Sequence, residues 1–155
     1  MPLFYAQRGF TLIQLLISLV LVGILASLAF PAYRQHIQNS RLTEAQAALL
    51  TNARFMEQFY SEHKSFKATS TSWPTLPLTQ TDHFCIRLQG NARGANSEKF
   101  TIKAVAFDKT QESRTIKIND DLSTQLCAST LSSCSDGNTF FSGANGTDQN
   151  CTVYR

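Results

Sequence analysis

Three cationic residues, Arg87, Lys103 and Lys117, occupy corresponding places in three separate segments of this 155-residue chain. In each segment, apolar residues alternate with polar ones in the pattern of a β-strand buried on one face. Successive side chains of a strand point to opposite faces, so the apolar neighbours would face a core and the cations the other side. If the three strands align, the cations form a row suited to binding the phosphates of DNA or another polyanion. The alternative is a solvated outer face with no ligand.

Side chains of a second kind accompany these cations. Arg93 stands in a loop rich in glycine and asparagine, Ser72 and Trp73 lie in a Ser/Thr-rich connector, and Ser133 and Ser135 lie in a polar tail. Cations hold phosphates, whereas short polar side chains and aromatic rings reach base edges or stack on them. The chain has 14 Lys and Arg against 11 Asp and Glu, a small excess of positive charge. A polyanion can therefore be bound only where the cations gather on one face. The predicted DNA-binding residues are therefore Arg87, Lys103, Lys117, Arg93, Trp73, Ser72, Ser133 and Ser135. For Trp73, anchoring the connector to the core is the alternative.

Four cysteines form the other reactive group: Cys85, Cys127, Cys134 and Cys151. Their even number in a small domain predicts disulfides, and the absence of a Cys-x2-Cys pair disfavours zinc. Four cysteines allow three pairings, which the residues by themselves leave open. Three scattered histidines and the absence of hydrolase or phosphate-loop motifs indicate no enzyme, no cofactor and no metal site.

The element that must position this domain is an apolar stretch from Phe10 to Phe30, in which Gln14 is the only strongly polar side chain. As a helix it would be about 32 Å long, close to the thickness of a bilayer core. Beyond Pro31 the apolar residues continue at helical spacing, which predicts one helix to about Glu62 that packs its second half on a domain. An ordinary export signal cleaved after Ala29 and a plain membrane anchor are the alternatives.

Strand-like segments follow the helix and set the fold class. They are Phe84 to Leu88, Phe100 to Phe107, Thr115 to Asn119 and Leu122 to Ala128. Short links predict an antiparallel meander of four strands laid on the helix, hence an α+β fold. The stretch from Ser129 to Arg155 has little periodicity and is predicted to be a loop region held by disulfides.

The N-terminal residues resemble those of type IV prepilins of the short-leader class. The matching residues are Gly9, the run Phe10-Thr11-Leu12-Ile13, and Pro31. The resemblance implies the type IV pilin fold, with a leader at residues 1–9, a transmembrane and polymerisation helix at residues 10–30, and a globular domain at residues 31–155. It also implies that prepilin peptidase cuts after Gly9 and methylates Phe10. Pilins carry a glutamate where this chain has Gln14, a position used in assembly with other pilin subunits.

Further segments resemble the minor pilins of this family that serve natural transformation. They include Asn52 to Tyr60, Ser65 to Leu78, Phe84 to Leu88, Ala92 to Ala95, Lys103 to Ala106 and Ser132 to Gly137. Such a pilin is a receptor for double-stranded DNA with a preference for a short uptake sequence. The resemblance implies an inner-membrane protein, with a single span and a periplasmic C-terminal domain, that then joins a surface-exposed pilus. It also implies that Arg87, Lys103 and Lys117 form an electropositive stripe.

The family also suggests how the cysteines pair. In pilins generally, a cysteine near the last strands bonds one near the C-terminus, which implies Cys127 with Cys151 and leaves Cys85 with Cys134. Pairing of Cys134 with Cys151 and of Cys85 with Cys127 remains open. Two functional alternatives also remain: a structural pilin whose outward cations pair with neighbouring subunits, and a secretion pseudopilin. Pseudopilins commonly have calcium-binding carboxylate clusters, whereas this tail has only Asp136 and Asp148.

Overall fold

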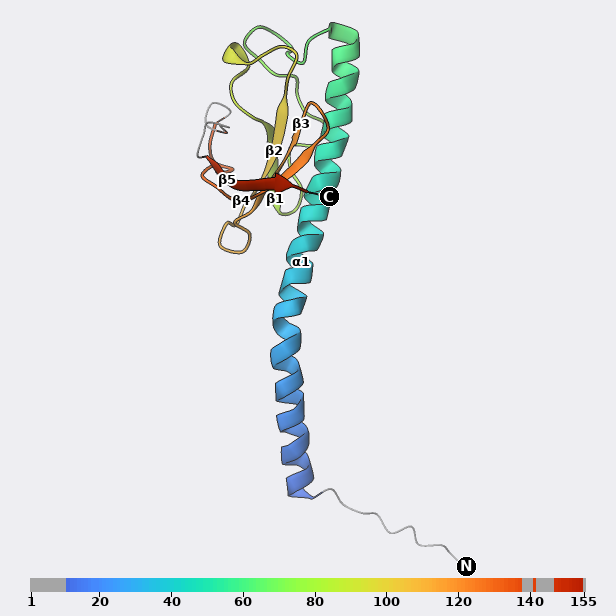
Figure 1. Ribbon diagram of the computed structural model, residues 1–155, viewed down its shortest axis with the longest axis vertical. Helices are drawn as coiled ribbons and strands as arrows, with labels where there is room; N and C mark the ends of the chain where they lie inside the picture. The colour runs from blue at the N-terminus through green and yellow to red at the C-terminus, as the bar shows by residue number, and fades with distance from the viewer. Residues whose placement is uncertain (1–10, 138–140, 142–146, 155) are drawn as a thin grey trace, which may run out of the picture. The chain divides into compact units, whose positions relative to one another are not determined.

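The computed structural model describes residues 11–137, 141 and 147–154. One long helix, α1 (Leu12–His63), is followed by β1 (Phe84–Leu88), a single 3-10 turn η1 (Ala92–Gly94), and the strands β2 (Thr101–Ala106), β3 (Thr115–Asn119), β4 (Thr124–Thr130) and β5 (Asp148–Val153) (Figure 1). The chain divides into two units, residues 1–39 and residues 40–155. Each unit is described by itself below.

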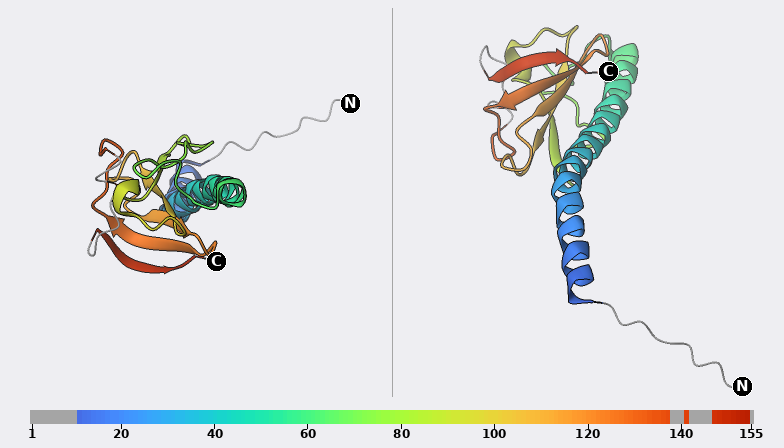
Figure 2. Two further views of the ribbon diagram at one scale, coloured as in Figure 1. Left: turned by 90° about the horizontal axis from the view of Figure 1, so that it is seen from above. Right: turned by 60° about the horizontal axis from the view of Figure 1, so that its bottom comes forward.

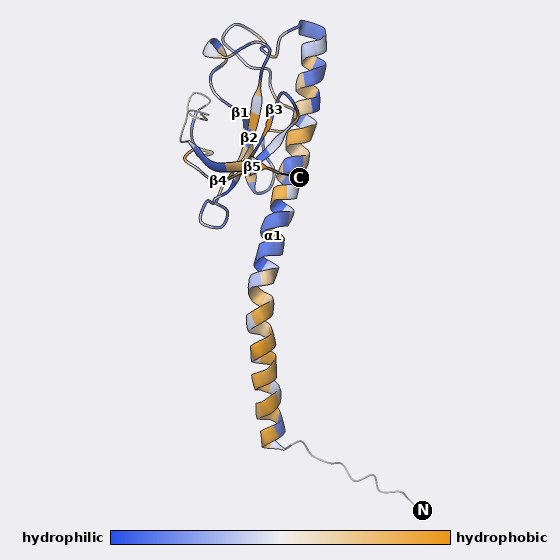
Figure 3. Ribbon diagram, viewed as in Figure 1, coloured by the Kyte–Doolittle hydropathy of each residue, from blue (hydrophilic) through white to orange (hydrophobic). Residues whose placement is uncertain are grey.

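The helical part of the first unit has an apolar surface. From Leu12 to Leu28 its large aliphatic side chains are more than half exposed, and Figure 3 shows the apolar stretch as an almost continuous run along this part of α1. It contains a window with a mean hydropathy of 2.6, long and apolar enough to cross a membrane. Pro31 lies inside the helix, as expected, and Gly9 and Phe10 lie outside the described residues. Such a surface is stable only in a membrane or against other apolar surfaces, which supports membrane anchoring and pilus assembly.

In the second unit, α1 packs one face on the sheet. Leu42, Ala45, Leu49, Ala53 and Met56 recur at steps of three and four residues and are completely buried. They form one core cluster with the apolar side chains of β1, β2 and β3, all on the same sheet face. Burying a large aliphatic side chain contributes about 1.5–3 kcal/mol, so this seam is the main source of stability for the domain. The helical face predicted from the sequence is confirmed.

The sheet is an antiparallel meander in the order β1-β2-β3-β4-β5. Figure 2 shows α1 along one side of the sheet, with β5 at the sheet edge. The expectation of four strands was wrong, because Asp148–Val153 adds a fifth strand from the predicted loop region. Its sequence, Asp-Gln-Asn-Cys-Thr-Val, has no apolar alternation because nearly all its side chains are exposed at this edge. The fourth strand begins at Thr124, two residues later than predicted, because Leu122 has a positive φ of 60° and lies in the turn.

Two disulfides fasten the C-terminal region to the sheet: Cys85–Cys134 and Cys127–Cys151. This is the pairing implied by the pilin resemblance, and the alternative of Cys85 with Cys127 and Cys134 with Cys151 is excluded. Cys127 and Cys151 are also direct partners in the β4–β5 register, so the bond holds the polar edge strand in place. With sequence separations of 49 and 24 residues, the chain-entropy account assigns the two bonds about 4 and about 3.5 kcal/mol.

Candidate nucleic-acid interface

The three predicted cations stand in one line across three strands. In the sheet register Arg87 is opposite Lys103, and Lys103 is opposite Lys117. Their apolar neighbours belong to the core cluster packed on α1, so the cations lie on the face away from the helix. The predicted alignment of the strands is therefore confirmed. Like charges directly opposite each other repel, so such a row needs compensating groups close by.

The row is covered, which the sequence did not predict. Lys103 is completely buried, and its Nζ lies 3.0 Å from Oδ1 and 3.3 Å from Oδ2 of Asp148. It also donates to Oγ of Ser132 at 2.8 Å. The expectation that Lys103 faces solvent was wrong, because residues of the C-terminal region pack over this face of the sheet. A lysine amine in that position cannot reach a phosphate directly.

Asp148 connects two cations of the row. Its Oδ2 lies 3.4 Å from Nζ of Lys117, and its Oδ1 accepts a hydrogen bond from Oγ1 of Thr130 at 2.6 Å. The carboxylate side chain is 4% exposed, while that of Lys117 is 16% exposed. Burial lowers the pKa of Lys103, and the hydrogen bond and charge of Asp148 oppose that shift. The three cations and this one carboxylate leave two formal positive charges on the row.

Arg87 is bound by the tail through neutral groups. Its guanidinium donates to the backbone carbonyl of Cys134 at 2.8 Å and to that of Asp136. It also lies 5.8 Å from the ring centroid of Phe141, and Nζ of Lys103 lies 5.1 Å from the same ring. Such cation–π contacts are attractive and need no counter-charge. Arg87 and Lys103 therefore hold in place the C-terminal segment that covers them.

The tail hydroxyls are held beside the row. Ser133 and Ser135 hydrogen-bond each other through their Oγ atoms at 3.0 Å, and the backbone N of Ser133 donates to Oδ2 of Asp136 at 2.6 Å. The disulfide of Cys134 ties this turn to β1. Ser135 is exposed and Ser133 is half-buried. The structure thus brings both serines close to the row and gives them a fixed local geometry.

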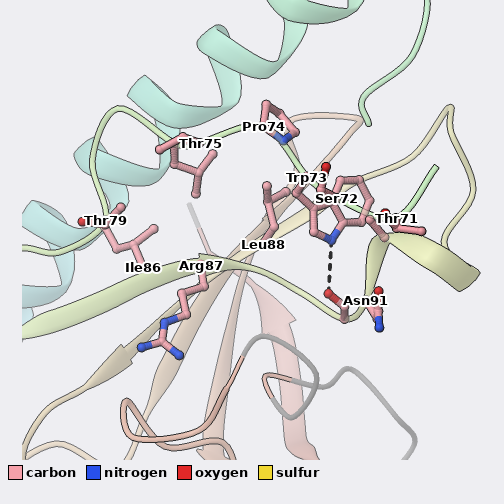
Figure 4. A pocket seen from close by; sticks show the side chains of 13 residues that line it. Thr71, Ser72, Trp73, Pro74, Thr75, Thr79, Ile86, Arg87, Leu88 and Asn91 are labelled. Carbon is pink, nitrogen blue, oxygen red and sulfur yellow. Dashed lines mark hydrogen bonds between the residues drawn. The ribbon is translucent and has the colours of Figure 1, made fainter. Parts of the chain in front are cut away.

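Trp73 and Ser72 belong to a different place, a cavity of about 370 Å³ between the connector and β1. In Figure 4 the side chains of Ile86 and Leu88 point to the Trp73 side of β1, whereas that of Arg87 points to the opposite side. The indole Nε1 of Trp73 donates to the carbonyl of Gly90 at 3.1 Å, and the ring packs against the core cluster. The anchoring alternative for Trp73 is confirmed. Arg87 also lines this cavity, but its guanidinium points to the opposite side of β1, so Trp73 and the charged groups of the row lie on opposite sides of the strand.

Arg93 lies on η1, in the loop between β1 and β2, and its side chain is exposed. Lys67 fastens this loop, because its Nζ donates to the carbonyls of Ala92 at 3.1 Å and Ala95 at 2.8 Å. Lys99, in the same loop, is also exposed and was not predicted. No periodicity singles out a loop lysine, so the sequence carried no signal for it.

Asp148 is the residue of this site that the sequence reasoning missed. One feature of the sequence could have indicated it: Asp136 and Asp148 are the only acidic residues in the tail, so few other carboxylates there could pair with the cations. Within the part of the chain that the structure describes, no group of His, Cys, Asp or Glu residues could hold a metal ion.

Comparison with known proteins places these features in context. The family described as type IV minor pilin ComP, DNA uptake sequence receptor, matches residues 31–132, and the prokaryotic N-terminal methylation motif matches residues 5–30. The structure is similar to the solution NMR structure of the minor DNA-uptake pilin ComP from Neisseria subflava. The TM-score is 0.60 with 46% identity, over 74% of this chain and 95% of that one.

Curated pilins match over a shorter length. The type IV major alpha-pilin of Moraxella bovis is 35% identical over 80 residues, half of this chain and half of that protein. A fimbrial protein of Neisseria meningitidis is 35% identical over 66 residues, 43% of this chain and 39% of that protein. The chain therefore spans about half or less of the length of these curated relatives.

Proposed function

This chain belongs to the family of type IV minor pilins described as ComP, the DNA uptake sequence receptor, and from that premise we propose that it binds extracellular double-stranded DNA in natural transformation. It is a pilin subunit and not an enzyme. The observation that carries the proposal is the row of Arg87, Lys103 and Lys117, aligned across three strands on the sheet face away from α1. A line of positive charge on one face matches the repeated phosphates of a DNA strand.

The cations divide the work according to their exposure. Lys117, whose side chain solvent reaches in part, and Arg93, which is exposed, contact phosphates. Arg87 and Lys103 act from beneath, by raising the positive potential and by holding the tail in place. Each phosphate contact contributes about −0.9 to the slope of log K against log salt concentration. Two or three contacts predict a slope of about −2 to −3, with little dependence on base sequence.

Preference for a short uptake sequence comes from the polar side chains of Ser133 and Ser135 beside the row. Ser133 and Ser135 lie beside the row, and their hydroxyls can both donate to and accept from base edges. The disulfide at Cys134 holds the turn that carries both serines, which lowers the conformational entropy lost when the serines bind base edges. Ser72 and Trp73 lie on the other side of β1. Ser72 is exposed and contributes where a duplex extends past this edge of the sheet, and Trp73 contributes by anchoring the connector that carries Ser72.

The N-terminal unit places the receptor in the inner membrane and then in a pilus. Prepilin peptidase cuts after Gly9 and methylates Phe10, as the match to the methylation motif supports. The apolar helix holds the protein in the inner membrane, with its C-terminal domain in the periplasm, before assembly with other pilin subunits. Gln14 carries no charge, and its Oε1 accepts from the backbone N of Thr11 at 3.1 Å. N-terminal sequencing of the mature protein tests the cleavage and should begin at Phe10.

The central experiment measures fluorescence anisotropy of labelled duplexes with the full chain in detergent micelles. Lys117→Gln should weaken binding to every duplex about three- to tenfold and make the salt slope shallower by about 1. Arg54→Gln removes the same charge from an exposed position on α1, across the sheet, and should leave both quantities unchanged. Equal affinity and slope in wild type and Lys117→Gln would refute phosphate contact by the row.

Base reading is tested by a different comparison. Ser135→Ala should reduce the ratio of affinities for preferred and scrambled duplexes and leave the salt slope as it is, because no charge changes. A ratio that stays the same in Ser135→Ala and in Ser133→Ala would remove these serines as readers.

One observation favours a structural pilin instead. Asp148 already pairs with Lys103 and Lys117 within the same subunit, so the row has a counter-charge without DNA. Absence of any duplex binding by the wild-type chain at about 0.05 M salt, where electrostatic binding is strong, would establish this alternative.

A further inference from the structure

The surroundings of the Asp148 carboxylate form an anion-binding site. Three donors converge on its two oxygens: Nζ of Lys103 at 3.0 Å, Nζ of Lys117 at 3.4 Å and Oγ1 of Thr130 at 2.6 Å. Two ammonium groups and a hydroxyl are the donors that bind a phosphate oxygen in proteins. The group that occupies the site comes from the protein itself.

We propose that Asp148 is an internal competitor of the DNA backbone, pairing with the Nζ of Lys117 to which a DNA phosphate binds. This inference rests on the proposed function and adds a control on it. With Asp148 in place the row keeps only part of its positive charge. A phosphate that takes Lys117 from the carboxylate gains the full charge of that lysine, while Lys103 keeps Asp148 from beneath, so phosphate binding and release of Lys117 by Asp148 are coupled.

The position of Asp148 in the fold permits such a displacement. It begins β5, an edge strand paired on one side only, whose other five residues are exposed. The pairing with β4 skips Ala128 and Asn150, and Asn150 has a positive φ of 51°. Beyond these two residues, Gln149 and Asp148 pair again with Ser129 and Thr130, so the backbone of Asp148 stays in the sheet. The carboxylate can therefore leave Lys117 by a rotation of its side chain at the strand end, while the backbone stays fastened.

Arg87 distinguishes this site from a purely structural ion pair. Its guanidinium has backbone carbonyls and an aromatic ring as neighbours, and no ion pair joins it to a carboxylate among the described residues. Among the described residues no direct ion pair takes up its charge, which therefore adds to the attraction for an incoming phosphate. Asp148 acts only on the Lys103–Lys117 part of the row.

Asp148→Asn tests the inference, because it keeps the shape of the side chain and removes the charge. Binding of preferred and scrambled duplexes to the full chain in micelles should become about three- to tenfold tighter at 0.05 M salt. The salt slope should become steeper by about 1, because the row regains one positive charge that Asp148 no longer neutralises. Glu57→Gln is the matched control, since it removes one negative charge from an exposed position on α1 and should change affinity less than about 1.5-fold.

The outcomes separate this inference from the proposed function. If the wild-type chain binds DNA but Asp148→Asn binds no more tightly and with the same slope, the inference is overturned and the receptor function stands. If the wild-type chain does not bind, the proposed function itself fails. Should Asp148→Asn not fold, Lys103→Met is compared with Lys103→Met/Asp148→Asn. The double variant should bind more tightly because Lys117 is released, and equal binding would overturn the inference.

Discussion

Lys103→Met should destabilise the domain strongly and yet leave the salt slope of DNA binding unchanged. Methionine preserves most of the length and volume of lysine, so the substitution removes a charge and creates little empty space. It deletes the contacts of Nζ with Asp148 and with Oγ of Ser132. A residue that holds the tail but touches no phosphate should behave in this way.

The size of the effect follows from the burial of the pair. Removing one partner of a buried ion pair costs about 3–5 kcal/mol, because the other charge is left without compensation. Here Asp148 keeps Lys117 and Thr130 as partners, so the lower end, about 3 kcal/mol, is expected. For a domain of this size that corresponds to a fall in Tm of about 10–15 °C.

The assay is thermal unfolding of the full chain in micelles under non-reducing conditions, followed by fluorescence. Trp73 is the single tryptophan and packs on the core of the domain, so it reports unfolding of this unit. Lys103→Met/Asp148→Leu should recover much of the loss, since an apolar pair replaces the buried charges. A fall in Tm of less than about 3 °C for Lys103→Met would refute the buried ion pair. A shallower salt slope would refute the indirect role of Lys103.

Three further predictions concern the parts that position the site. Asn52→Ala should cost about 2 kcal/mol in the free energy of unfolding, because the buried amide donates to the carbonyl of Leu78 at 2.7 Å and accepts from its backbone N at 3.0 Å; chemical denaturation measures this loss. Cys127→Ser/Cys151→Ser should lower stability by about 3.5 kcal/mol and increase hydrogen exchange in β5 more than in β1 to β3. Gly90→Ala should cost about 1 kcal/mol, because Gly90 has a φ of 76° and the space around it is open, so that only the backbone strain is felt; an unchanged Tm would contradict this.

The alternation of apolar and polar residues predicted most of the sheet. It located β1, β2 and β3, and it placed Arg87, Lys103 and Lys117 on one face, because period-two patterns are strong where one face is buried. It did not predict β5. An exposed edge strand needs no apolar alternation, and its place is decided by the pairing with β4 and by the Cys127–Cys151 bond.

The exposure of the row was beyond the reach of local patterns. Alternation shows which way Lys103 points but not what lies above it. The segment that covers it is brought there by Cys134, by the carbonyls bound to Arg87 and by Asp148, which is 45 residues away in sequence from Lys103. These contacts carry no periodic signal, because each joins residues far apart in the chain.

The sequence by itself determined the apolar helix and the face that α1 buries. It also determined that one cation of each of three strands points away from the core, and that four cysteines are present to form disulfides. Each of these depends on residue types and on neighbours within a few residues. The tertiary structure alone decided that the tail folds over the cations and that a carboxylate lies between two of them. The physical reason is that a buried charge must be compensated by whatever group the fold brings within reach, and only the folded chain places Asp148 there.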